Sequence, residues 1–109
     1  MGMFDSVTFK YQMPDGFEGC DFQTKDLASE TDEYEVTAAG RLIRTFAGYH
    51  NQIGDIEYDG RVTLTSTSNS HRVHGYTLVF KAGDLVLIEC HQTNSTLPFE
   101  KHLAHRAER

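Results

Sequence analysis

The sequence predicts a β-rich α+β fold, in which an antiparallel sheet built from hairpins carries a short C-terminal helix. Segments such as Ser6–Tyr11 alternate apolar and polar residues with the two-residue period of a strand. Glycine-containing turn signals separate these segments at Ala39-Gly40, Asp59-Gly60 and Ala82-Gly83-Asp84. Near the carboxyl end, apolar residues recur at every fourth position, as on one face of a helix, at Phe99, Leu103 and Ala107.

Length and composition predict a single domain spanning residues 1–109. Apolar residues make up 39% of the chain, with seven Phe and five Tyr, which is enough for one hydrophobic core without disulfides or a structural metal. The formal charge of −6 argues against a nucleic-acid partner, because such binding relies on clustered Lys and Arg. The acidic excess serves solubility or attracts a basic partner surface.

No apolar run approaches the roughly 20 residues needed to cross a bilayer, and no secretory leader is visible, so we expect a cytoplasmic protein without a membrane partner. Cys20 and Cys90 are far apart and lack Cys-x-x-Cys spacing. We therefore expect two reduced thiols, with Cys90 in the core.

The amino-terminal part is expected to hold two strands and a loop. Ser6–Tyr11 forms the first strand and ends at the turn signal Met13–Gly16. Phe22–Lys25 forms a second, short strand. Asp26–Glu33 is too polar to bury and is expected to be a surface loop.

Two hairpins are expected in the middle of the chain. Ala39-Gly40 joins Glu35–Ala38 to Arg41–Phe46, because glycine tolerates a positive φ. After an irregular connection at Tyr49–Ile53, Asp59-Gly60 joins Asp55–Tyr58 to Arg61–Thr67.

The strand Arg61–Thr67 is expected to bury one face only. Val62 and Leu64 point to the core, whereas Thr63, Thr65 and Thr67 face water. We treat Arg61–Ser68 as a candidate sheet edge, through which two copies could pair into a homodimer.

The last hairpin and the helix are expected to cover each other. Tyr76–Lys81 and Leu85–His91 are nearly continuously apolar, which predicts a hairpin covered on both faces. Ser95 or Thr96 would cap the helix and Pro98 would occupy its first turn.

Residues with metal-binding or catalytic chemistry are dispersed along the chain. The pairs His71/His74 and His102/His105 have no carboxylate or cysteine at matching spacing, so we expect no metal and no cofactor. The acidic stretch that contains Asp32 is interpreted as a solvated surface. No phosphate loop, serine elbow or activated cysteine is present, so the chain is not expected to be an enzyme.

Several short motifs resemble a group of small, uncharacterised proteins encoded by bacterial viruses and prophages. These motifs are Met1–Asp5, Phe22–Lys25, Gly40–Leu42, Gly54–Ile56 and the aromatic strand that ends at Phe80 before Gly83. Some similar proteins carry a cysteine knuckle after the first strand. This chain has Tyr11-Gln12-Met13-Pro14-Asp15 at that place, so the resemblance implies no metal role here.

The resemblance implies a small accessory protein that acts in the cytoplasm of a bacterial host. We expect a non-enzymatic protein-interaction module that binds a basic, host-encoded protein such as a defence component. Exposed-aromatic and charge arguments give the candidate interaction surface: Phe22, Gln23, Thr24, Lys25, Asp26, Tyr49 and His50.

Two alternatives remain open at this point. One is a small-ligand-binding domain or enzyme with a cleft near the Tyr49–Ile53 connection, where His50 and Asp55 would act as acid and base. The other is a virion or assembly component.

Overall fold

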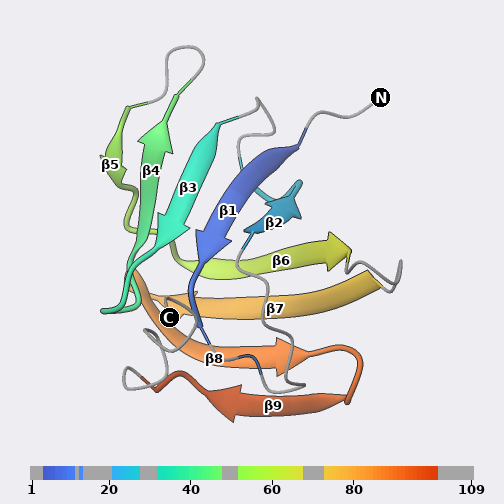
Figure 1. The fold of residues 1–109 in the computed structure, drawn as a ribbon. Helices are drawn as coiled ribbons and strands as arrows, with labels where there is room; N and C mark the ends of the chain where they lie inside the picture. Colours follow the sequence, from blue (N-terminus) through green and yellow to red (C-terminus); the bar gives the residue numbers. More distant parts are fainter. Residues whose placement is uncertain are drawn as a thin grey trace.

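The computed structural model describes residues 4–11, 13, 21–27, 32–47, 52–67 and 73–100. Nine strands in this part of the chain form one mixed sheet with the order β5-β4-β3-β1-β2-β6-β7-β8-β9 (Figure 1). The strands are β1 (Asp5–Phe9), β2 (Asp21–Thr24), β3 (Glu33–Val36), β4 (Leu42–Phe46), β5 (Gly54–Asp55), β6 (Gly60–Thr67), β7 (Val73–Lys81), β8 (Asp84–Cys90) and β9 (Ser95–Pro98).

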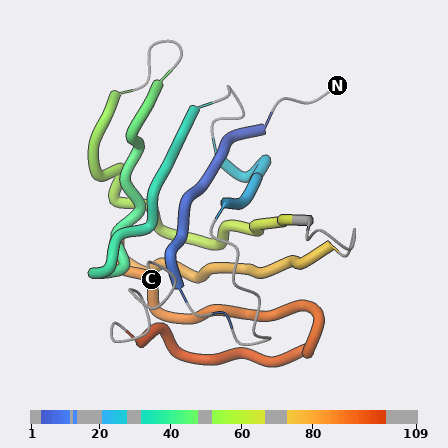
Figure 2. The backbone as a smooth tube through the Cα atoms, in the orientation of Figure 1, coloured from blue at the N-terminus to red at the C-terminus, as the bar shows by residue number. Residues whose placement is uncertain are grey.

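The sheet bends so that its two halves lie across each other. Strands β1, β3, β4 and β5 run steeply in Figure 1, whereas β6 to β9 run across the view. The halves join at β2 and β6, where Gln23 and Thr65 are the paired residues. At another corner, an isolated bridge joins Arg41 to Asp84, and the Leu85 amide donates to the Gly40 carbonyl at 2.8 Å. Figure 2 shows the course of the backbone through the two halves of the sheet.

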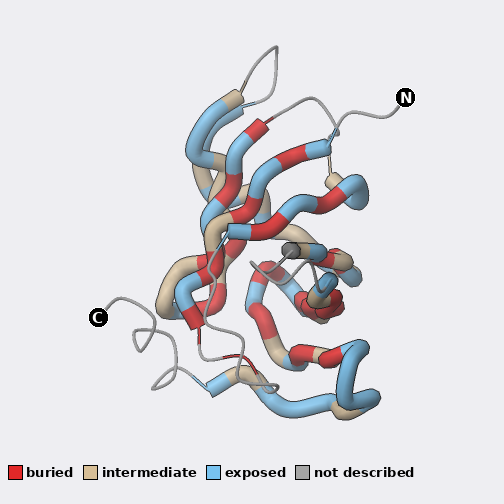
Figure 3. Tube along the Cα trace, turned by 45° about the vertical axis from the view of Figure 1, so that its right-hand side comes forward, coloured by how far each residue is buried: buried red, intermediate tan, exposed pale blue. Residues whose placement is uncertain are grey.

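The core lies between the two halves. Figure 3 shows buried and exposed residues alternating along the strands. Phe22 from β2 meets Tyr76 from β7 edge to face, with ring centroids 5.8 Å apart. The buried apolar residues are Val7, Phe9, Tyr11, Met13, Phe22, Tyr34, Val36, Leu42, Val62, Leu64, Tyr76, Leu78, Phe80, Leu85, Ile88 and Cys90.

Two of the expected hairpins are confirmed. At the first, Gly40 adopts a φ of +87° between β3 and β4, and its amide donates to the Thr37 carbonyl at 2.9 Å. At the second, Ala82 and Gly83 have φ values of +53° and +88° between β7 and β8. Positive φ at both central residues matches the right-handed twist of the flanking strands.

The hairpin expected at Asp59-Gly60 is wrong. Strand β5 pairs with β4 through Ile43↔Asp55, whereas β6 pairs with β2 and β7. The residues between β5 and β6 instead carry the chain from one half of the sheet to the other. Tyr58 fixes this crossing, because its ring packs edge to face on Phe80 with centroids 5.8 Å apart.

Three other expectations about the sheet need correction. The sheet is not antiparallel throughout, because β1 and β3 pair in parallel. Arg61–Ser68 is not a sheet edge, since β6 lies between β2 and β7. The last hairpin is not covered on both faces within the described structure, because the Leu87 side chain is 36% exposed.

The start of the expected C-terminal helix is also wrong. Ser95–Pro98 is extended and forms β9, paired with β8. Phe99 still packs inward, with its ring centroid 5.4 Å from that of Tyr11. Leu103 and Ala107 lie outside the described residues, and the described part of the chain contains no helix.

Candidate binding surface

Strands β2, β1 and β3 turn alternate side chains away from the core. Their register places Asp21 beside Thr8 and Glu35 in one row across the strands. A second row places Gln23 beside Ser6 and Glu33. Cross-strand neighbours share a face of a sheet, so these residues form one surface. We call it the outer face: Ser6, Thr8, Asp21, Gln23, Glu33 and Glu35.

The outer face contains connected hollows. One, of about 650 Å³, spans from Ser6 and Thr8 across β2 to β6. A hollow of about 320 Å³ continues from Gln23 along Thr24, Lys25 and Asp26. A third, of about 190 Å³, shares Ser6 and Thr8 with the first and reaches Glu33 and Glu35. Together they make a concave track along β3, β1, β2 and β6, and Thr45 of β4 and Val73 of β7 also line it.

The hollows beside β6 exist because β2 and β6 separate on either side of a single paired position. Hydrogen bonds involving side chains take the place of backbone–backbone hydrogen bonds between β2 and β6 there. The Ser66 hydroxyl donates to the Asp21 carbonyl at 3.0 Å, and the Thr63 amide donates to Asp26 Oδ2 at 2.7 Å. A junction held by side chains leaves room that a continuous ladder would fill.

Three carboxylates on the outer face have no partner among the residues that the structure describes. Asp21, Glu33 and Glu35 are exposed, and their side chains make no hydrogen bond or ion pair within the described residues. Asp21 and Glu35 lie two strands apart, about 10 Å across the sheet. Lys10 and Lys25 are the cations that line the hollows, against the carboxylates of Asp21, Asp26, Glu33 and Glu35, so negative charge exceeds positive charge there.

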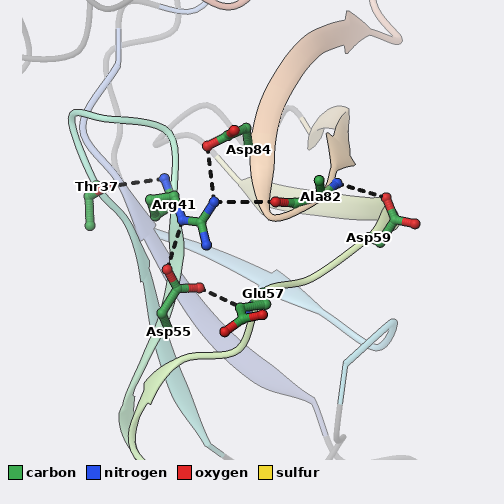
Figure 4. Close-up of polar contacts among 7 residues, drawn as sticks. All are labelled: Thr37, Arg41, Asp55, Glu57, Asp59, Ala82 and Asp84. Atoms are coloured by element: carbon green, nitrogen blue, oxygen red, sulfur yellow. Dashed lines mark hydrogen bonds and ion pairs between the residues drawn. The ribbon is translucent and has the colours of Figure 1, made fainter.

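Most other acidic side chains among the described residues make internal bonds, and the exposed carboxylate of Glu57, in the connection after β5, is the exception. Arg41 binds Asp55 at 2.7 Å and Asp84 at 3.0 Å, and this cluster joins the two halves of the sheet (Figure 4). Hydrogen bonds from Arg41 and from the Glu57 amide lower the pKa of Asp55, and the bonds to both aspartates raise the pKa of Arg41. This cluster therefore closes the fold.

A second cluster of internally bonded groups contains Asp32, so the expectation that Asp32 lies on a solvated surface is wrong. Its carboxylate is buried, and so is that of Asp5. The Asp32 amide donates to Asp5 Oδ1 at 2.9 Å, and Arg44 Nε lies 3.3 Å from Asp32 Oδ2. Arg44 also donates to the Tyr34 hydroxyl. Burial raises the pKa of that hydroxyl by more than the hydrogen bond from Arg44 lowers it. These groups join β1, β4 and the start of β3.

The structure divides the expected interaction residues. Phe22 is 2% exposed and belongs to the core, so its interpretation as an exposed aromatic is wrong. Thr24 is also buried, whereas Gln23, Lys25 and Asp26 are exposed and line the hollows.

Tyr49 and His50 lie outside the described residues. Sequence reasoning missed the remainder of the outer face, on β1 and β3. The polar positions that alternate with core residues in those two strands were the available signal, but only the parallel pairing brings them together.

The alternative site near Asp55 gains no support from its geometry. The Asp55 carboxylate is held by Arg41, and an ionised carboxylate with a lowered pKa is a weak base. Within the described residues, no three His, Cys, Asp or Glu side chains gather as a metal site requires. His71, His102, His105 and Cys20 are outside this part of the chain.

None of the described segments forms a helix long and apolar enough to span a bilayer. Comparisons with models of protein families, with curated proteins and with solved structures gave no match.

Proposed function

We propose that this chain is a non-enzymatic protein-interaction module whose outer face binds a basic partner protein. The observation that carries this proposal is the difference between its acidic residues. Carboxylates at the closing corner and inside the fold are paired, whereas Asp21, Glu33 and Glu35 are exposed without a partner among the described residues.

Unpaired carboxylates of one sign favour association with an oppositely charged surface. They steer the encounter, and they repel acidic competitors. The net charge of −6 adds to this effect at long range. Two exposed apolar residues line the hollows and supply contact area: Phe4 is 40% exposed and Val73 is 64% exposed.

The resemblance to phage and prophage proteins makes a bacterial lysate the natural source of the partner. The tagged full chain is incubated with lysate at low and at high ionic strength. We expect a specific protein to be retained at low salt and released at high salt, because exposed charge pairs are screened.

A charge-reversal pair tests whether the outer face is responsible. Glu35→Lys places a cation on the face, whereas Glu57→Lys makes the same change in net charge in the connection after β5. Both residues are exposed, so we expect both variants to fold. Retention should be lost in Glu35→Lys and kept in Glu57→Lys. Equal retention by the two variants, or no retained protein at either salt concentration, would refute the proposal.

A further inference from the structure

The hollow of about 650 Å³ has an unusual set of hydrogen-bond acceptors. The Asp21 carboxylate and the Gln23 side-chain amide both line it. Neither side chain makes a hydrogen bond to another described residue. The volume lies within the range of pockets that hold drug-sized ligands, about 300–1,000 Å³, so a single arginine side chain has room to enter it.

Hydroxyl groups extend this set along both walls. Ser6 and Thr8 contribute hydroxyls from β1, and Thr65 and Ser66 contribute them from β6. The Ser66 hydroxyl donates its proton to the Asp21 carbonyl at 3.0 Å, so its oxygen lone pairs remain available as acceptors. A carboxylate, an amide oxygen and several hydroxyls therefore face one space.

An apolar side chain borders the same space. Val73 lines the hollow, and its side chain is 64% exposed. An occupant that combines a cation with several donors and an apolar stem would use both the acceptors and this wall.

Arginine has these properties. Its guanidinium carries five N–H donors in a plane, can bind a carboxylate through two of them and has a three-carbon stem. The ammonium of lysine is a compact charge with three donors and holds its water more strongly. Arginine is also among the residues that contribute most to protein interfaces.

We propose that this hollow, the Asp21 pocket, receives an arginine side chain of the partner protein. Asp21 pairs with the guanidinium, Gln23 and the hydroxyls accept its remaining protons, and Val73 packs on the stem. This inference rests on the proposed function, because it specifies how the outer face would hold a basic partner.

The first experiment uses small probes on the full chain. Acetyl-arginine-methylamide and acetyl-lysine-methylamide are titrated separately, and backbone amide chemical shifts are followed by NMR. We expect the arginine probe to shift the amides of Asp21, Gln23 and Thr65 in a saturable way and to bind more tightly than the lysine probe.

Two neutral variants test the role of the carboxylate. Asp21→Asn should weaken arginine-probe binding about tenfold, since hydrogen bonds to charged groups contribute about 1.5–3 kcal/mol. Glu57→Gln removes one charge elsewhere and should leave binding unchanged. Equal binding of the two probes, or unchanged arginine binding by Asp21→Asn, would overturn the proposal.

A blocking variant tests whether the partner itself uses the pocket. Ser6→Tyr fills the hollow without changing charge, and Thr96→Tyr places the same ring at an exposed position on β9. Capture of the partner should fail with Ser6→Tyr and persist with Thr96→Tyr. If capture is lost in Glu35→Lys but persists in both Asp21→Asn and Ser6→Tyr, the arginine pocket is refuted and the acidic interaction face stands. If capture also persists in Glu35→Lys, both proposals fail.

Discussion

Arg44 balances the charge of a carboxylate that the fold removes from water. Asp32 is buried, and the Arg44 side chain, 15% exposed, lies 3.3 Å from it. The guanidinium also donates to the Gln52 carbonyl at 3.0 Å and to the Tyr34 hydroxyl. One cation thus connects three segments of the chain.

Replacing this cation should be costly. Arg44→Met leaves the buried Asp32 carboxylate without its ion pair, and we expect the free energy of unfolding to fall by about 3 kcal/mol. Arg61→Met is the matched control, because Arg61 forms an exposed pair with Glu89 at 2.7 Å and should contribute less than about 1 kcal/mol. Urea unfolding of both variants measures the difference. Similar losses in the two variants would contradict the account of the Arg44 cluster.

Asp55 should make stability depend on pH in the acidic range. Its folded-state pKa is lowered from 3.8, so the unfolded chain takes up this proton more readily. The stabilisation is therefore present above the unfolded value and is lost as the pH falls through the folded value. Unfolding free energies of the unmodified chain and of Asp55→Asn should differ most above the unfolded pKa of 3.8, and the difference should shrink as the pH falls below that value. A difference that is independent of pH would argue against this ion pair.

At the scale of elements, the turn between β7 and β8 is the most sensitive connection. Gly83 has a φ of +88°, and a Cβ there would lie 2.6 Å from the Arg41 guanidinium. The same two-residue turn thus sets the twist of the hairpin and leaves space for Arg41, which joins the two halves of the sheet.

Gly83→Ala should destabilise the protein by about 1–2 kcal/mol through its left-handed backbone, and should also displace Arg41. Ala82→Gly changes the neighbouring residue, whose φ is also positive at +53°, and should be neutral or stabilising. Thermal unfolding of the two variants tests whether Gly83→Ala lowers stability while Ala82→Gly does not. A loss of stability in Ala82→Gly as large as that in Gly83→Ala would contradict it.

Local sequence predicted elements better than their partners. The strands around Val7, Phe22 and Leu64 and the turns at Gly40 and Gly83 follow from alternation and from glycine conformation. Asp59-Gly60 carried an equally good hairpin signal, but the packing of Tyr58 on Phe80 directs the chain into a crossing instead. Ser95–Pro98 had helix-start chemistry, yet its backbone pairs with β8.

The candidate surface was only partly predictable for the same reason. Gln23, Lys25 and Asp26 were found because they are adjacent in sequence. Glu33 and Glu35 join them through the parallel pairing of β3 with β1, which depends on the whole fold. Phe22 was misinterpreted, because its polar sequence neighbours conceal its contact with Tyr76 from the other half of the sheet.

For the whole molecule, the arrangement of charge matters more than its total. Asp32, Asp55 and Asp84 pair with arginines inside the fold. Among the described residues, three unpaired carboxylates therefore lie together on the outer face, and Glu57 is an unpaired acid away from it. The salt response of binding should therefore depend on this face and little on net charge alone.

The most direct test of this account is the affinity of the captured partner as a function of salt concentration, measured for the unmodified chain, Glu35→Lys and Glu57→Lys. We predict that affinity falls with salt for the unmodified chain and Glu57→Lys, and that Glu35→Lys binds weakly at low salt with a shallower salt dependence. Identical affinities and salt dependences for the two lysine variants would contradict a basic partner on the outer face.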